Sequence, residues 1–303
     1  MGLQKSLLDQ FRLSNAEQNL GVYGIHVYKA GEGEVEHRFF ADDVINVYSC
    51  SKTFTSIGVG ICQDDGLIDI NDPLLKYFPE YESVASPGSE AITLRDLLHM
   101  AAGKDFARFD EEEEKSMDLA EAFFRRPMIH KAGEFFFYCS PATYMLGRVV
   151  EKVSGKILRD FLMPRLFEPF GIHNPQWQMC PRGHTLSAAG LQLKTSQLAK
   201  IGRLMLHKGE YEGKRIVSAG YIDKMHTDVV DNGHYNNDAE STCGYGYQVW
   251  RCTTPGTYRA DGLYGQFSIV LPQQNAVVST TSHNEKRAND IVRAIFSDIV
   301  PQL

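Results

Sequence analysis

The chain has 303 residues, of which 43% are hydrophobic and 23% are charged, so it is long enough to bury a large core and has the composition of a globular protein. This composition excludes a disordered or fibrous chain. The formal net charge of -7 argues against a nucleic-acid partner, because phosphate binding needs a basic surface.

Two further absences bear on location and cofactors. No stretch has the apolar length that a bilayer requires, and the first twelve residues lack the apolar run of a signal peptide. We therefore expect a cytoplasmic protein without a membrane partner. The six cysteines are scattered and form no C-x-x-C pair, which predicts reduced thiols and no zinc ribbon.

The first predicted elements form a β-hairpin followed by a helix. Residues 22–28 and 35–40 are runs of β-type residues, and residues 30–33 (AGEG) between them are typical of a turn. Further on, Phe54, Ile57 and Ile61 lie on one helical face that ends before Gly66.

The middle of the chain is predicted to be helical. Leu146, Val149, Val150 and Val153 form one apolar face, and Gly155 follows where a C-terminal cap belongs. A similar pattern over residues 198–205 follows Thr195 and Ser196, either of which is a suitable N-cap.

The last part of the chain returns to strands. Residues 246–251, 267–271 and 276–281 are predicted strands, residues 272–275 a turn, and residues 291–300 a helix. Strands at both ends predict an α+β fold, in which both chain ends form an antiparallel sheet flanked by helices around a mainly helical inserted region. We expect one catalytic unit over residues 1–303, with a sheet region of about residues 1–65 and 210–303 and a helical region of about 66–209.

One short motif carries a candidate chemistry. Ser49 and Lys52 form an S-x-x-K motif, but a chain of this composition is expected to contain about one such match by chance. The motif opens the helix predicted after residue 49, which places Lys52 on the same side as Ser49. A helix N-terminus favours developing negative charge, and a desolvated lysine is able to accept the serine proton.

The alternative is that Ser49 caps the helix and Lys52 is solvated. Other signatures of hydrolytic chemistry are missing, however. The sequence has no G-x-S-x-G elbow, no H-E-x-x-H zinc motif and no histidine in a triad setting. Cys50 and Cys139 are further candidate nucleophiles, but neither has a nearby histidine in the sequence.

Several segments, taken in order, resemble the serine β-lactamase and penicillin-binding-protein superfamily, in its class C and carboxylesterase-like branch. The nucleophile segment is 47–54 (VYSCSKTF) and the second catalytic block is 132–140 (AGEFFFYCS). Supporting blocks are 66–73 (GLIDINDP), 92–98 (ITLRDLL), 151–155 (EKVSG), 167–172 (FEPFGI), 188–191 (AAGL) and 209–215 (GEYEGKR).

The resemblance implies a β-lactamase/transpeptidase-like fold with the active site between the sheet and the helical region. It implies that Ser49 is the nucleophile, Lys52 the adjacent base and Tyr138 the tyrosine that passes the proton onward. Without the resemblance, the neighbours of Tyr138 favour a core tyrosine in an aromatic strand.

Three positions depart from the family pattern, and two of them affect the expected substrate. Met100 replaces a histidine in residues 97–103 (LLHMAAG), a structural variation in a block that supports the fold and not the chemistry. Ser140 stands where asparagine is usual. The third motif, in residues 259–266 (RADGLYGQ), lacks a clear cation, although Arg259 supplies one if the register shifts. Ser140 and the missing cation point away from penicillin-like substrates, which present a carboxylate to that cation.

The expected substrate-binding residues follow from this alignment. They are Ser140 and the third-motif residues Ala260, Asp261, Gly262 and Leu263, where a backbone N–H, together with that of Ser49, forms the oxyanion hole. Tyr245, Tyr247 and Trp250 are either pocket residues or core.

The predicted function is a serine hydrolase that works through an acyl-enzyme, preferably on small esters. Amide or D-amino-peptide bonds are the next choice and β-lactams the third. A catalytically weak, ligand-binding relative is the alternative of another class. We expect no metal and no organic cofactor, a small-molecule ester or amide as partner, and we assign no oligomeric state.

Overall fold

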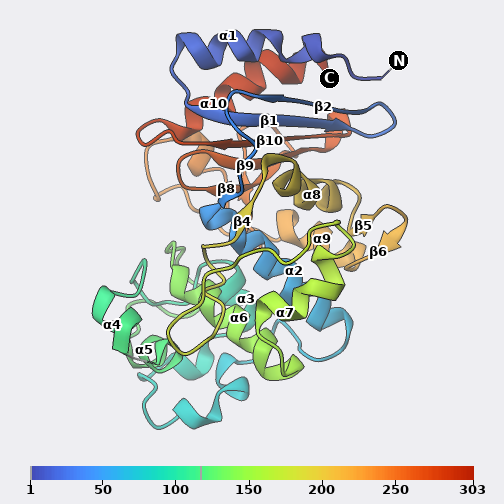
Figure 1. The fold of residues 1–303 in the computed structure, drawn as a ribbon. Coiled ribbons are helices and arrows are strands. Elements are labelled where there is room, and N and C mark those ends of the chain that lie inside the picture. The colour runs from blue at the N-terminus through green and yellow to red at the C-terminus, as the bar shows by residue number, and fades with distance from the viewer. Residues whose placement is uncertain (1, 117) are drawn as a thin grey trace.

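The computed structural model describes residues 2–116 and 118–303. Within them, six strands form one antiparallel sheet in the order β2-β1-β10-β9-β8-β7 (Figure 1). The N-terminal hairpin thereby pairs with the C-terminal one, and Val27 lies opposite Val278. This confirms the predicted sheet. Its strands are β1 (Val22–Lys29), β2 (Gly33–Arg38), β7 (Trp250–Arg251), β8 (Tyr258–Gly262), β9 (Gln266–Leu271) and β10 (Ala276–Ser282).

Terminal helices cover one face of the sheet. α1 (Asp9–Glu17), α10 (Ala288–Ala294) and the π-helical turn η9 (Ile295–Ile299) lie together on this face (Figure 1). Ile269 of β9 points into the core beneath them, whereas its neighbour Val270 points to the opposite core. Successive side chains of the strand therefore point into two different cores, and both are apolar because both faces of the sheet are buried.

α8 (Thr195–Leu206) packs on the other face, against β1, β9 and β10. The approach is close, since a Cβ added to Gly202 would lie 2.5 Å from the Val277 side chain. The predicted Thr195 cap is wrong. The Thr195 hydroxyl bonds to Thr281 at 2.7 Å, and Gln197 Oε1 accepts from the Lys194 amide at the helix start.

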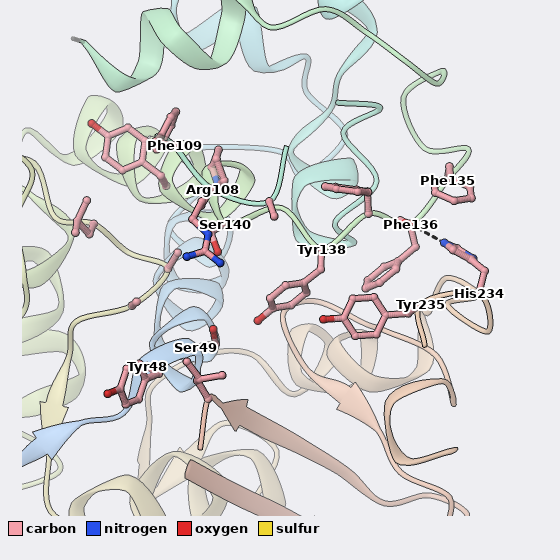
Figure 2. Close-up of a pocket in the computed structure, with 18 residues that line it drawn as sticks. Tyr48, Ser49, Arg108, Phe109, Phe135, Phe136, Tyr138, Ser140, His234 and Tyr235 are labelled. Atoms are coloured by element: carbon pink, nitrogen blue, oxygen red, sulfur yellow. Dashed lines mark hydrogen bonds between the residues drawn. The ribbon is translucent and has the colours of Figure 1, made fainter. Parts of the chain in front are cut away.

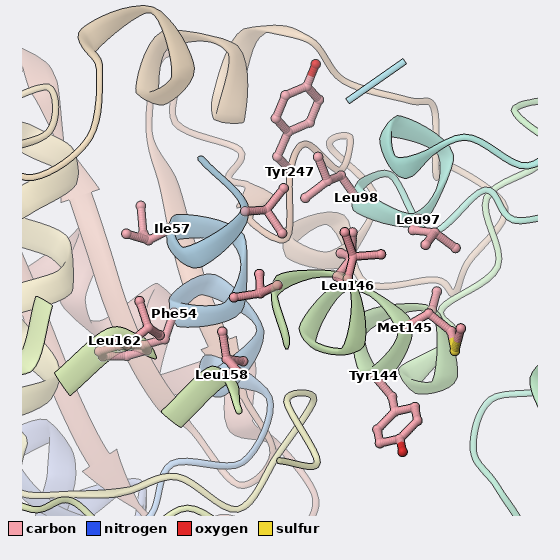
Figure 3. Close-up of a cluster of buried hydrophobic side chains, with 14 of the residues drawn as sticks. Phe54, Ile57, Leu97, Leu98, Tyr144, Met145, Leu146, Leu158, Leu162 and Tyr247 are labelled. Carbon is pink, nitrogen blue, oxygen red and sulfur yellow. The ribbon is translucent and has the colours of Figure 1, made fainter. Parts of the chain in front are cut away.

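The helical region lies beyond this face, and α2 runs through its centre. Residues 51–62 of α2 are buried, with Gly58 and Gly60 set against the side chains of Leu158 and Tyr221. Figure 3 shows Phe54 and Ile57 of α2 in one core with Leu146 of α6. The helices are α2 (Ser51–Asp64), α3 (Leu94–Leu98), α4 (Glu111–Ser116), α5 (Leu119–Arg125), α6 (Ser140–Ser154), α7 (Leu158–Leu162) and α9 (Ala219–Thr227).

The predicted end of α6 is confirmed, but the predicted strand over residues 246–251 is mostly wrong. Gly155 caps α6 with a φ of 71°. Residues 246–249 are not a strand, because Gln248 has a φ of 61° and donates its amide to the Leu98 carbonyl. Two small ribbons complete the fold: β3 (Ile45–Asn46) with β4 (Gln192–Leu193), and β5 (Glu210–Tyr211) with β6 (Lys214–Arg215).

No helix among the described residues has both the length and the apolar character needed to cross a bilayer.

Candidate active site

Ser49 lies in a short 3-10 turn, η2 (Tyr48–Cys50), directly before α2. Its neighbour Tyr48 adopts a left-handed φ of 47°, which is uncommon for a bulky residue. The Asn46 side chain holds the turn by accepting from the Tyr48 amide at 2.8 Å and the Gly190 amide at 3.2 Å. Ser49 therefore lies in the turn that leads into α2 and not inside the helix, which begins at Ser51.

Lys52 is buried beneath this turn, with 1% of its surface exposed. Its Nζ lies 3.0 Å from Ser49 Oγ and 3.0 Å from the Ala188 carbonyl oxygen. Burial lowers the pKa of Lys52 to about 7. A large fraction of the amine is therefore neutral at physiological pH and able to accept a proton.

Tyr138 reaches the same point from the helical region, two residues before α6. Its ring centroid lies 4.9 Å from Lys52 Nζ, and its hydroxyl is directed toward Ser49 (Figure 2). Burial raises the pKa of Tyr138 far above its ordinary value, an effect that the contact with the Ser49 side chain opposes. The phenol is thus protonated, and Trp250 supports its ring at a centroid distance of 5.4 Å.

A cavity of about 790 Å³ opens in front of Ser49 and Tyr138 (Figure 2). Ser140, the first residue of α6, also lines it, and its amide donates to the Ala107 carbonyl at 3.0 Å. Besides Tyr138, other aromatic side chains make up much of the wall, namely Tyr48, Phe109, Phe135, Phe136, Phe137, Tyr144 and Tyr235. Such a lining suits an apolar ligand with few polar groups.

The third-motif strand runs beside the Ser49 turn. A Cβ on Gly262 would overlap the Val47 carbonyl oxygen and lie 3.3 Å from the Cys50 nitrogen, so glycine allows β8 to lie against the turn. Leu263 lines the cavity, whereas Ala260 is fully buried and Asp261 faces Arg259.

Arg259 does not supply the missing cation. Its side chain is fully buried, lies 2.8 Å from the Asp261 carboxylate and donates to the Glu240 carbonyl at 2.8 Å. The guanidinium is therefore engaged behind the strand and does not line the cavity, so the shifted-register interpretation was wrong.

The family follows from comparison with known proteins. A family model described as Beta-lactamase matches residues 20–298. The chain belongs to the beta-lactamase family.

Two individual proteins are similar to this chain at low sequence identity. The lovastatin esterase of Penicillium rubens is 27% identical over 192 residues, which cover 55% of this chain and 48% of that protein, so the match spans about half its length. The 6-aminohexanoate-dimer hydrolase of Paenarthrobacter ureafaciens is 24% identical over 298 residues, covering 91% and 72% of the two chains.

A solved structure confirms the fold. A putative 6-aminohexanoate-dimer hydrolase from Bacillus anthracis superposes with a TM-score of 0.79 over 96% of this chain and 81% of that one, at 18% identity. At this identity the similarity shows a beta-lactamase-family fold and not a shared substrate.

The two candidate cysteines are poorly suited to nucleophilic attack. Cys50 is buried and donates its thiol to the Gln266 carbonyl. Burial raises the pKa of Cys50, and it raises the pKa of Cys139 to about 12. Neither thiol lines the cavity among the described residues.

The remaining aromatic candidates divide between support and core. Tyr245 and Trp250 pack behind the Tyr138 ring, and Tyr247 packs against His99 and Tyr221 in the core. None of the three lines the cavity, so the core interpretation was right.

Sequence reasoning missed three features of the cavity. Arg108 and Tyr235 line it from loops that carry no motif, and the Ala188 carbonyl holds the Lys52 amine. The 188–191 block gave a signal for the Ala188 segment, but nothing in the sequence singles out the two loop residues.

Proposed function

We propose that the chain is a serine hydrolase that cleaves small esters through an acyl-enzyme on Ser49. The observation that carries this proposal is the 3.0 Å separation between Lys52 Nζ and Ser49 Oγ at the floor of the aromatic cavity. A buried amine with a pKa of about 7 is matched to proton transfer near neutral pH.

The proposed reaction begins with attack of Ser49 Oγ on the ester carbonyl carbon, while the Lys52 amine takes the hydroxyl proton. Main-chain N–H groups of Ser49 and of the segment that ends β8 hold the oxyanion. The C–O bond to the alcohol then breaks, and Tyr138 passes the proton from Lys52 to the leaving oxygen. Water enters and attacks the acyl-enzyme with the same pair of groups, which releases the acid and restores Ser49.

Three considerations favour esters over the other substrates of this chemistry. The aromatic wall offers apolar contact to an acyl chain of modest length. Ser140 presents a hydroxyl where β-lactam-processing relatives present an amide. One of the matching proteins is named as an esterase, although amide or D-amino-peptide bonds remain the second choice and β-lactams the third.

A series of p-nitrophenyl esters of increasing acyl length tests the proposal. We expect Ser49-dependent turnover with an optimum at a short or medium chain, and a loss of about 10³-fold or more in Ser49→Ala. Ser6→Ala, which removes an exposed serine far from the site, serves as the matched control. Ester turnover at background level in the folded wild-type protein would favour the ligand-binding alternative.

A further inference from the structure

Arg108 is a cation on the wall of the candidate active site. Its side chain extends beside Ser140 into the cavity (Figure 2). The loop that carries it is fixed to the catalytic block, because the Ala107 carbonyl accepts the Ser140 amide at 3.0 Å. The backbone that carries Arg108 therefore has a defined position relative to Ser140, and the Arg108 side chain is exposed to solvent.

Two carboxylates of the segment that follows Arg108 are engaged elsewhere. Asp110 Oδ1 accepts from the Glu113 amide at 2.9 Å, and a Glu113 oxygen lies 2.6 Å from Arg126. Within the described residues, no acceptor bonds to Arg108 and no aromatic ring lies under its guanidinium, whereas Arg126 packs over Phe106. Among the residues that the structure describes, Arg126 thus has partners and Arg108 has none.

The rest of the lining offers no counter-charge. The described lining residues include no aspartate and no glutamate. The histidine of the lining, His234, bonds through Nε2 to the Phe136 carbonyl. This local excess of positive charge contrasts with the net charge of -7 of the whole chain. A ligand that fills the cavity takes water from the guanidinium, and this costs free energy unless the ligand brings an anion.

Building on the proposed ester hydrolysis, we infer that Arg108 binds a carboxylate of the substrate, so that the preferred ester is apolar and carries one negative charge. Guanidinium binds carboxylate through two parallel N–H···O bonds, which fixes orientation as well as adding affinity. This assignment places substrate charge recognition on the 107–109 loop, next to Ser140, and not on the third-motif strand, where Arg259 is occupied.

Two pairs of esters that differ in charge test the assignment. p-Nitrophenyl butyrate and p-nitrophenyl hemisuccinate share acyl length, but the second ends in a carboxylate; phenyl acetate and 4-acetoxybenzoate place the charge on the leaving group. We expect Arg108→Gln to lower kcat/KM about tenfold or more for the charged member of one pair and less than about twofold for its neutral partner. Arg108→Lys should recover part of the loss.

Arg12→Gln is the matched control, because Arg12 lies on α1, on the far side of the sheet. Arg12→Gln should leave kcat/KM unchanged for both pairs of esters. Equal effects of Arg108→Gln on charged and neutral esters in both pairs would overturn the assignment while leaving ester hydrolysis intact.

If wild-type protein cleaves no ester, the proposed function fails, and a binding experiment then judges Arg108 alone. Calorimetric titration should show succinic monoanilide binding about tenfold or more tighter than butyranilide, with the difference lost in Arg108→Gln. Equal binding of the two anilides would overturn the assignment.

Discussion

Gly262 lies against Val47 so closely that no side chain fits between the end of β8 and the turn that carries Ser49. The strand backbone therefore reaches the proposed oxyanion position only because residue 262 is glycine. The contact brings the third-motif strand, near the C-terminal end of the chain, against the segment that carries Ser49.

Gly262→Ala should displace β8 or the Ser49 turn. We expect a loss of about 10²-fold in kcat, since a displaced oxyanion donor has this order of effect, and a stability loss of about 1–3 kcal/mol from overpacking. Gly220→Ala in α9 is the control, because a Cβ there meets nothing within 4 Å. Ester kinetics with thermal unfolding of both variants measures the difference, and wild-type activity in Gly262→Ala would contradict the oxyanion placement.

The activity should depend on pH through Lys52. Below its pKa of about 7 the amine is protonated and unable to accept the Ser49 proton, so kcat/KM should rise with pH to a plateau above this midpoint. A profile with neutral esters, checked by circular dichroism for constant folding, measures this. A midpoint near the ordinary lysine value of 10.5 would show that the amine is not desolvated in solution.

Tyr138→Phe removes the hydroxyl but keeps the ring that packs on Trp250. We expect kcat to fall about 10²-fold or more, because proton delivery to the leaving oxygen is lost, while the fold is retained. Tyr245→Phe, which alters the aromatic support and not the cavity wall, is the comparison variant. Equal losses in the two variants would assign Tyr138 a packing role.

Lys52→Met should abolish activity and stabilise the protein by about 1–3 kcal/mol at neutral pH, even after the loss of two hydrogen bonds. The folded pKa of about 7 lies below the reference 10.5, so between these values the unfolded wild-type chain binds more protons and its stability rises with pH.

The advantage of Lys52→Met should therefore shrink as pH rises from about 7 to 10. Lys104, whose pKa burial lowers to about 8, is present in both proteins and cancels from the comparison. Denaturant unfolding at the two pH values gives the difference, with the exposed Lys156→Met as control. A stability difference between Lys52→Met and wild type that stays the same at both pH values would contradict a desolvated Lys52 amine.

Local signals predicted a good part of this fold. The spacing of Ser49 and Lys52 placed both on one side of a helix start, and Gly155 marked a helix end, since each depends on residues within one or two turns. The hairpin at the N-terminus was equally readable from its own sequence.

Features that depend on distant partners were not predictable in this way. Gln248 breaks an apparent strand because its amide bonds to the Leu98 carbonyl, some 150 residues away in the chain. The placement of Tyr138 near Ser49 came from family resemblance alone, and Arg108 had no signal, because an unpaired charge is visible only when its surroundings are known.

The most direct test of the central claim is site-mapped labelling with a fluorophosphonate. Intact-mass and peptide analysis should find one phosphonyl group per chain, on Ser49, and none on Ser49→Ala. Labelling at another residue, or a folded wild-type protein that resists the reagent, would contradict a lysine-activated serine.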